Sequence, residues 1–441
     1  MNEGKTGAFI IGMNGIWEQL AAAAARISTQ KGDALNIFEN SKDNPANRGL
    51  IKKVLSSGHY SVLEHIVINI AFQNVSAVVE QFMIEFRLAS FMVKSRRYVD
   101  FSDAGYYVPK SLNGANEKIF RDHINYLFGE YEYMESIGVP KEDARFLLPY
   151  CFCSNFYCTV NARELLLIIR RMMYGKTAGA CELKSIGGQL LHQLKESCPA
   201  LYDEFYVSRS EFMADTGPAY IPTAEDGIAE GSGGIELIHY SEDADDVLRT
   251  AARVKGETYA GAESVLKKHR TRELEHLTYT FIFRGISLSG ITHVARHRMQ
   301  SLTVPSVGNV VPGRYLIPET IRRDEAARER YAAAFRANKN IRLQLKANSA
   351  DEDDLCYLVL SGNLLDVMST MNARELSLFF KLRSCRRAQW EIRDFADGLH
   401  KKLAGISPEI FMFMGPSCYV EGACPEGKLS CGRPRANLFN E

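Results

Sequence analysis

The sequence predicts an α+β protein made of two tandem copies of one domain, each a mixed sheet with flanking helices. Its length of 441 residues exceeds what one hydrophobic core usually serves, because domains cluster at roughly 100–200 residues. A single shift of 211 positions, which takes residue 64 to residue 275, aligns polar motifs of the two halves. Both halves also show strand-like alternation followed by helical spacing.

The repeat itself is carried by short motifs in constant register. Glu64-His65 recurs as Glu275-His276, and the pentapeptide that begins at Asn161 recurs unchanged at Asn372. Single residues that match at the same shift are Ser76 and Ser287, Arg87 and Arg298, Ser90 and Ser301, and Ser95 and Ser306. An identical pentapeptide in register with matches about a hundred residues upstream indicates a duplication.

Each copy is predicted to contain an early strand and later helices. The alternating apolar residues are Ile66, Ile68, Ile70 and Phe72 in the first copy, and Leu277, Tyr279, Phe281 and Phe283 in the second. Helical spacing follows in the stretch from Val78 to Phe86, and again after each Asn-Ala-Arg-Glu-Leu. This order of elements predicts a mixed α and β domain in each half.

The boundary between the copies follows from composition. The stretch PTAEDGIAEGSGG, residues 222–234, is rich in glycine and acidic residues and has almost no large apolar side chains, as flexible connectors do. We therefore predict a first domain at 1–220, a linker at 221–234, a second domain at 235–415 and a cysteine-containing tail at 416–441.

Composition narrows the class of protein. Lysine plus arginine equals aspartate plus glutamate at 53 each, so no overall charge draws the chain to a nucleic acid or to an acidic membrane. No apolar run reaches the roughly 18–20 residues of a membrane-spanning helix, and no secretory signal is recognised. We expect a soluble cytoplasmic protein whose ten cysteines are reduced thiols or metal ligands.

Three cysteines in the tail are the candidate metal ligands. Cys418, Cys424 and Cys431 lie close together among glycine and proline, a pattern that suits zinc or an iron–sulfur cluster but equally suits free thiols, because a fourth ligand is not evident. The tail is therefore a candidate zinc site. Cys151, Cys153 and Cys158 stand among aromatic residues and are predicted to be buried small side chains.

A basic cluster marks the second copy. Arg296-His297-Arg298 is followed by seven residues and Ser306, and later by NARELSLFFKLRSCRRAQWEIR. Two guanidiniums and an imidazole could clamp a phosphate or polarise an electron-rich ring, although alone they would be read as a solvated turn. With its context, the pattern resembles the flavin-dependent thymidylate synthases, whose signature is Arg-His-Arg, seven residues, Ser. The first copy has GHYSVLEH, FRLASFMVKSRRY, DARFLLP and NAREL in the family's order.

The resemblance implies an activity. Enzymes of this family lack a nucleophilic cysteine and use reduced FAD, with NADPH as its reductant, to convert the methylene of methylenetetrahydrofolate into the methyl of dTMP. The expected substrate is dUMP. A related deoxyuridylate hydroxymethyl transferase, or a degenerate flavin and nucleotide binder with a regulatory or scaffolding role, is the alternative.

In the second copy the family's residues are retained in part. The resemblance implies that Arg296, His297, Arg298, Asn372 and Arg374 contact flavin, that His293 and Ser306 contact the nucleotide, and that Arg383 is the catalytic arginine over the uracil ring. A guanidinium there would stabilise the anion that forms on the ring. The family's Ser-x-Arg-Tyr is lost after Ser306, and Cys356 replaces a phosphate-binding arginine.

The first copy shows the opposite losses. Glu85-Phe86-Arg87 replaces the basic triplet, and Met172 replaces the uracil arginine. The nucleotide-binding residues Ser95, Arg96, Arg97 and Arg145 are kept, as are the flavin-side residues His59, Ser61 and Glu64, the first of which is Arg270 in the second copy. Because family sites lie between subunits of a homotetramer, we expect composite sites in a homodimer of the fused chain, whose four domains would mimic that tetramer.

Overall fold

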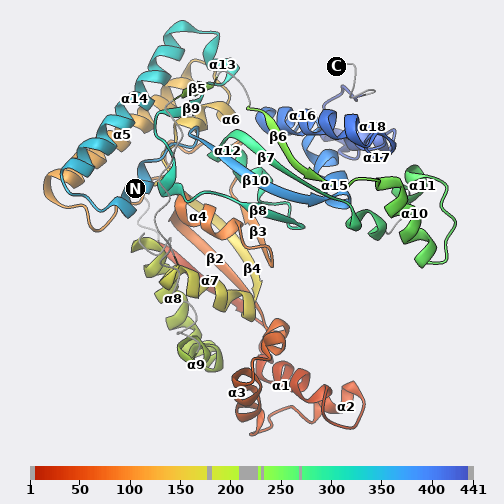
Figure 1. Cartoon of the computed structure of the whole chain (residues 1–441). Coiled ribbons are helices and arrows are strands. Elements are labelled where there is room, and N and C mark those ends of the chain that lie inside the picture. The colour runs from red at the N-terminus through yellow and green to blue at the C-terminus, as the bar shows by residue number, and fades with distance from the viewer. Residues whose placement is uncertain (1–4, 176–180, 208–226, 230–232, 268–270, 436–441) are drawn as a thin grey trace. The chain divides into compact units, whose positions relative to one another are not determined.

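The computed structural model describes residues 5–175, 181–207, 227–229, 233–267 and 271–435 (Figure 1). The chain forms two compact units, each made mostly of one copy. Unit 1 comprises Met1–Tyr133, Leu148–Ile221 and Asn338–Val359, and unit 2 comprises Met134–Leu147, Pro222–Ala337 and Leu360–Glu441. Each unit therefore contains one segment from the other copy. We call Met134–Leu147 and Asn338–Val359 the exchanged segments.

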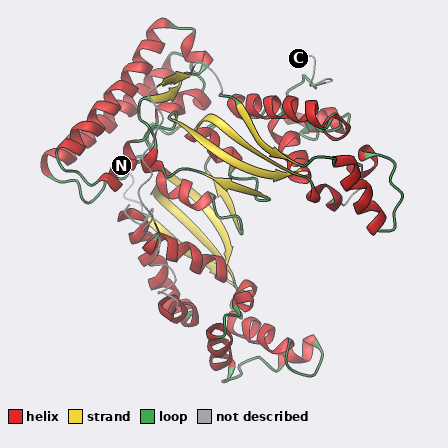
Figure 2. Ribbon diagram, in the orientation of Figure 1, coloured by secondary structure: helices red, strands yellow, loops and turns green. Residues whose placement is uncertain are grey.

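Each unit contains a four-stranded antiparallel sheet, drawn in yellow in Figure 2. The order is β1-β2-β4-β3 in unit 1 and β6-β7-β10-β8 in unit 2, so corresponding strands occupy corresponding places. The bounds are β1 Gly7–Met13, β2 Val67–Ser76, β3 Ala89–Val93 and β4 Cys153–Asn161, then β6 Ile235–Tyr240, β7 Thr278–Ser287, β8 Gln300–Thr303 and β10 Leu364–Asn372.

The two sheets share the same irregularity. The pairing of β2 with β4 shifts register between Phe72 and Val75, and the pairing of β7 with β10 shifts between Leu365 and Val367. At the matching positions Asn74 has φ +50° and Gly285 has φ +67°, which is the left-handed backbone that a bulge commonly requires. Duplication thus preserved a local backbone feature as well as sequence motifs.

The predicted strands and their inward faces are confirmed. The alternating residues of β2 and β7, and the residue before each strand, are all buried, with exposures of 2% or less in both copies. The predicted helices are also present: α4, Ala77–Ile84, follows β2, and α7, Ala162–Tyr174, and α15, Ala373–Arg383, follow the two Asn-Ala-Arg-Glu-Leu motifs. Asn161 and Asn372 cap these two helices by accepting a hydrogen bond from the main-chain nitrogen three residues later.

Helices complete both units, and two long ones are divided between them. In unit 1 they are α1 Trp17–Ile27, α2 Ala34–Glu39, α3 Asn47–Ser56, η1 Tyr60–His65, α8 Cys181–Ser197, α9 Pro199–Val207 and η7 Glu352–Leu358. In unit 2 they are α6 Lys141–Ala144, η2 Arg145–Leu147, α10 Ala244–Val254, α11 Ala262–Leu266, η5 Arg272–His276, α12 Leu288–Val294, η6 Val307–Asn309, α13 Glu319–Arg322, α16 Trp390–Ile406, α17 Pro408–Phe411, α18 Ser417–Val420 and η8 Gly427–Leu429. The divided helices are α5, Gly114–Ser136, and α14, Glu325–Ala347.

The exchanged segment of the first copy is built into the core of unit 2. The Asp143 carboxylate accepts hydrogen bonds from Trp390 Nε1 at 2.7 Å and from Thr320 Oγ1 at 2.6 Å. Phe146 is fully buried, and its carbonyl oxygen accepts a bond from the Gly362 nitrogen at 2.9 Å. A Cβ at Gly362 would lie 2.9 Å from the Cβ of Phe146, so the close approach requires glycine there.

The exchanged segment of the second copy is bound equally firmly in unit 1. Asn338 shares a buried hydrogen bond of 3.0 Å with His123, and Ser111 donates to the Asp354 carboxylate. The Cys151 nitrogen donates to the Tyr357 carbonyl oxygen at 3.0 Å. The exchange is therefore reciprocal, since equivalent segments of the two copies have changed places.

Part of the predicted linker has regular structure. Its described residues include β5, Gly227–Ala229, which pairs in parallel with β9, Arg314–Leu316. In the part of the chain that the structure describes, no helix combines the length and the apolar character needed to cross a membrane.

Candidate functional site

The basic triplet of the second copy lies directly after α12 in unit 2. Ser287 caps this helix by accepting from the Gly290 nitrogen at 2.9 Å. His297 is 3% exposed, whereas Arg296 and Arg298 on either side of it are exposed. The loop therefore turns its imidazole inward and carries its two guanidiniums on the surface.

Three residues on one face of α15 surround the His297 ring. Its Nδ1 lies 2.9 Å from Glu375 Oε1, and Arg383 Nε donates to its Nε2 at 3.0 Å. The Phe379 ring packs against it edge-on, with centroids 5.0 Å apart. Burial lowers the pKa of His297; the hydrogen bond to Glu375 opposes that shift and the Arg383 charge reinforces it. The structure thus brings His297 and Arg383 together, as a buried neutral base holding a guanidinium.

Arg374 is engaged with the neighbouring 3-10 helix. It pairs with Glu275 of η5, and the equivalent residues of the first copy, Arg163 and Glu64, form the same ion pair at 2.6 Å. All four side chains are at least 32% exposed, so these pairs contribute little to stability. Asn372, the other predicted flavin residue of this helix, lies at its N-cap and is half-buried.

Arg145 is placed in the unit that contains Arg383. Only 2% of it is exposed, its Nε donates to the Glu142 carbonyl oxygen at 3.0 Å, and its guanidinium lies 5.9 Å from the centre of the Phe146 ring. Its charge also acts on the fully buried Glu391 carboxylate. A first-copy arginine is therefore part of the second unit, whereas its sequence counterpart in the second copy, Cys356, lies in unit 1.

Glu391 connects Arg145 to the helix that leads to the basic triplet. Its two carboxylate oxygens accept from the Ser287 nitrogen and hydroxyl at 2.6 and 2.5 Å. Burial raises the pKa of Glu391 to about 7, and the Ser287 bonds and the Arg145 charge oppose that rise. Sequence reasoning missed this residue because its counterpart in unit 1, Glu182, is displaced by two positions from the 211-residue register. Glu182 Oε1 accepts a hydrogen bond from the Ser76 nitrogen at 2.9 Å.

Unit 1 has an apolar cluster where unit 2 has the His297 site. Phe86 stands for His297 and Met172 for Arg383, and both are buried. Phe82 packs edge-on against Phe86 with centroids 5.2 Å apart. The first copy keeps the glutamate of the site, Glu164, but has neither the imidazole nor the guanidinium.

The retained nucleotide-binding residues of the first copy differ in exposure. Arg96 is buried in an ion pair with Glu80 at 2.6 Å, and its guanidinium lies 5.2 Å from the centre of the Phe152 ring. Arg97 is half-buried, with its guanidinium 5.3 Å from the centre of the exposed Tyr98 ring. Ser95 Oγ accepts from the Arg97 nitrogen at 3.3 Å. Arg96 is thus held internally, while Ser95 and Arg97 lie nearer the surface.

The other predicted residues are distributed as follows. His59 and Ser61 are exposed before and within η1 of unit 1, His293 is half-buried on α12, and Ser306 is exposed just before η6 in unit 2. Arg270 lies outside the described residues.

In the described part of the tail, the three predicted ligands are not gathered into a metal site. Cys418, Cys424 and Cys431 are free thiols, and across the described ranges no three His, Cys, Asp or Glu side chains gather as metal ligands. What anchors the tail is Arg435, which donates to the Ser384 carbonyl oxygen at 2.9 Å and to the Asp397 carboxylate. Cys151, Cys153 and Cys158 are buried, as predicted.

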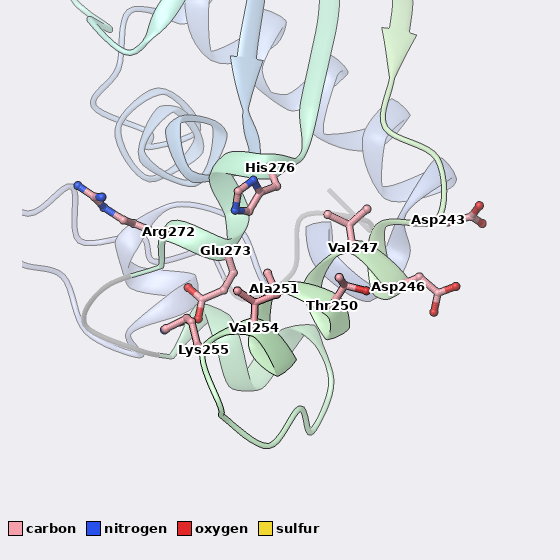
Figure 3. A pocket seen from close by; sticks show the side chains of 10 residues that line it. All are labelled: Asp243, Asp246, Val247, Thr250, Ala251, Val254, Lys255, Arg272, Glu273 and His276. Carbon is pink, nitrogen blue, oxygen red and sulfur yellow. The ribbon is translucent and has the colours of Figure 1, made fainter.

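A hollow of about 900 Å³ lies beside η5 of unit 2 (Figure 3). Its apolar lining comes from Val247, Ala251 and Val254 of α10, and its charged lining includes Lys255, which pairs with Glu273 at 2.6 Å. None of the predicted site residues lines this hollow. One lining residue, Arg272, is the second-copy counterpart of the predicted residue Ser61.

Comparison with known proteins matches both copies to one family. The family described as thymidylate synthase complementing protein matches residues 13–200 and 236–409, one segment for each predicted copy. A flavin-dependent thymidylate synthase of Geobacter sulfurreducens is 34% identical over 176 residues, covering 38% of this chain and 75% of the relative. That of Sulfolobus acidocaldarius is 32% identical over 205 residues, covering 42% and 78%. The solved structure of thymidylate synthase X from Helicobacter pylori with FAD and dUMP is 20% identical, with a TM-score of 0.37, over 46% of this chain and 99% of that one.

Proposed function

Because the chain belongs to the thymidylate synthase complementing protein family and carries two tandem copies of its domain, we propose that it is a flavin-dependent thymidylate synthase. In this proposal it methylates dUMP reductively to dTMP, with FAD as cofactor and with methylenetetrahydrofolate and NADPH as co-substrates. The relatives that are 32% to 34% identical carry that activity in their names. The observation that carries the proposal is the pair of His297 and Arg383, linked by a 3.0 Å hydrogen bond in the second copy.

The donor set of the second copy fits a flavin nucleotide. Arg296 and Arg298 are exposed cations on either side of a buried imidazole, and guanidiniums match the geometry of phosphate oxygens. We assign these residues, with Asn372 and Arg374, to FAD; His59, Ser61 and Glu64 are its proposed contacts from the first copy. FAD, when bound, supplies the reducing equivalents that turn the transferred methylene into a methyl group.

Arg383 is the proposed catalytic residue. Its guanidinium would lie against the uracil ring and stabilise negative charge that develops there. The buried acceptor His297 holds its Nε, so the orientation of the planar group is set before substrate arrives.

The proposed nucleotide site draws on both copies. Ser95 and Arg97 of the first copy would bind phosphate, with His293 and Ser306 of the second copy as further contacts. Arg145 is the second proposed phosphate cation, and a phosphate would compete with Glu391 for it. Arg96 would act indirectly, through the ion pair with Glu80 that fixes its segment.

The association proposed is a pair of chains, which supplies four domains. We place the enzyme in the cytoplasm, a reducing compartment in keeping with its ten free thiols.

The test is anaerobic incubation of the purified protein with dUMP, methylenetetrahydrofolate and NADPH, followed by mass analysis of the nucleotide. A product with the mass of dTMP is expected. Recovery of unchanged dUMP from flavin-loaded protein would exclude the synthase, and a hydroxymethylated product would assign the related transferase.

Cofactor binding is tested separately. Replacing Arg296 and His297 by the glutamate and phenylalanine of the first copy should abolish FAD binding. Arg87→Ala, which removes the arginine equivalent to Arg298 from the degenerate triplet, should leave it intact. Equal loss of FAD in both variants would show that the basic triplet of the second copy is not the flavin site.

A further inference from the structure

Glu375 is the part of the His297 site for which sequence comparison gives no role. It stands in the first turn of α15 and is 5% exposed, and its main-chain nitrogen is fixed by the Asn372 cap at 2.8 Å. Phe379 and Arg383 follow at steps of four residues, so all three side chains lie along one face of the helix. His297 contacts each of them, from the first turn of the helix to the last.

The hydrogen bonds to Arg383 and Glu375 together determine which nitrogen of His297 carries the proton. A guanidinium can only donate, so Nε2 must present its lone pair to Arg383 Nε. The proton of the neutral ring is then on Nδ1, which donates to Glu375 Oε1 at 2.9 Å. The other tautomer would set two N–H groups against each other at Arg383 and two lone pairs against each other at Glu375, so both bonds would be lost together.

We propose that Glu375 is a positioning residue, which fixes the tautomer of His297 and thereby holds Arg383 in its catalytic orientation. The proposal rests on the proposed function only in assigning catalysis to Arg383. It predicts that protonation of His297 at Nε2 also releases Arg383. The charged groups that act on the imidazole are the Glu375 carboxylate and the Arg383 guanidinium.

The first copy supplies a matched comparison. Glu164 occupies the same place in the same pentapeptide, receives the same asparagine cap at 2.9 Å and is 8% exposed. Its helix has Ile168 and Met172 where α15 has Phe379 and Arg383, and Phe86 replaces the histidine. If the glutamate served only the start of the helix, its loss would have the same effect on kcat in both copies. If it is a positioning residue, its loss would lower kcat only in the second copy.

The experiment compares Glu375→Leu, Glu375→Gln and Glu164→Leu in the full-length protein, by histidine-selective ¹⁵N NMR and by steady-state kinetics. The His297 signal is assigned from its absence in His297→Phe. We expect Nδ1 to be protonated in the unmodified protein and in Glu375→Gln, whose amide oxygen still accepts. In Glu375→Leu the two tautomers should mix, and kcat should fall roughly 10- to 100-fold because a catalytic group is misplaced, with KM for dUMP changed less than about 3-fold.

Two controls separate positioning from folding. Glu164→Leu should lower Tm less than Glu375→Leu does, because it leaves no buried imidazole nitrogen without a partner. It should also keep kcat within about 2-fold. Glu375→Gln should move the acidic limb of the kcat profile to lower pH, because the carboxylate that favours the imidazolium is gone. If Glu375→Leu does not fold, Glu375→Gln still provides this readout.

The outcomes distinguish the two proposals. An unchanged His297 tautomer in Glu375→Leu, equal losses of kcat in the two leucine variants, or an unmoved acidic limb would overturn the positioning role while leaving the synthase in place. If the unmodified protein forms no dTMP, the synthase fails, and the tautomer measurement still decides whether Glu375 controls His297.

Discussion

The reciprocal exchange predicts that a first-copy carboxylate stabilises the second unit. Asp143 is 3% exposed, and its two oxygens accept from Trp390 and Thr320, both of unit 2. Asp143→Ala would remove the acceptor of both donors, of which Trp390 is half-buried and Thr320 is exposed. Each hydrogen bond to a charged group contributes about 1.5–3 kcal/mol. Burial raises the pKa of Asp143, which means that keeping it ionised offsets part of this gain. We therefore expect a net loss of about 2–4 kcal/mol.

The assay is native-state hydrogen exchange followed by mass spectrometry. Peptides covering α13 and the start of α16 should exchange about 30- to 800-fold faster in Asp143→Ala, since each 1.4 kcal/mol of opening free energy is a factor of ten. These peptides are far from residue 143 in sequence. Faster hydrogen exchange in these peptides would therefore show that the first-copy segment is packed in unit 2. It could not be caused by a change near residue 143 in the sequence.

The matched control is Asp354→Ala. Asp354 is the equivalent residue of the second copy, is 2% exposed and accepts from Ser111 of unit 1. Its loss should accelerate exchange around residue 111 and leave α13 and α16 unchanged. If Asp143→Ala loosens only first-copy peptides of unit 1, the reasoning from the exchanged segments is refuted.

Three further results are expected. Arg383→Ala should depress kcat by roughly 100- to 1000-fold and leave FAD bound, as measured by turnover and flavin absorbance, because the charge is needed most where the ring becomes anionic; a change confined to KM would contradict this. Arg97→Ala should weaken dUMP binding by about 1.5–3 kcal/mol in calorimetry without loss of flavin, because a charged phosphate contact is removed. An unchanged affinity for dUMP would show that Arg97 does not bind the phosphate. Burial raises the pKa of Glu182 to about 7, against the opposing Ser76 bonds. The protonated carboxyl therefore contributes stability that is complete below about pH 4.5 and is lost as pH rises through about 7. Glu182→Gln should remove about 3 kcal/mol of this pH dependence of the free energy of unfolding, measured in urea. An unaltered pH dependence would contradict this prediction.

The parts of the fold that the sequence predicts are those fixed by local order. The buried faces of β2 and β7 follow from alternation, which places every second side chain on one side of a strand. The starts of α7 and α15 follow from Asn161 and Asn372, since a cap satisfies main-chain donors of the first turn. Constant register between the copies then locates the same elements twice.

Local sequence order does not predict in which unit the exchanged segments lie. Periodicity shows that the residues around Phe146 are buried, but not which copy buries them, because an apolar side chain is satisfied equally by either core. The contacts that decide the question join positions such as Asp143 and Trp390, whose pairing no sequence spacing indicates. Glu391 was missed for a related reason, since its role depends on a hydrogen bond to Ser287 and its counterpart lies out of register.

The same physics explains why the imidazole and the guanidinium of the His297 site are either both present or both absent. In unit 2 the imidazole is 3% exposed and satisfied on both nitrogens, so losing Arg383 or Glu375 alone would leave a buried polar atom without a partner, at a cost of about 1–3 kcal/mol. Replacing the imidazole and the guanidinium together by apolar side chains avoids that cost. Unit 1 shows this outcome, with Phe86, Ile168 and Met172 all 8% exposed or less. Phe86→His would place an imidazole beside the Arg171 guanidinium, which lies 5.9 Å from the centre of the Phe86 ring, while Met172 occupies the position of Arg383. The second copy therefore keeps the paired imidazole and guanidinium, which the first copy lacks at the matching positions.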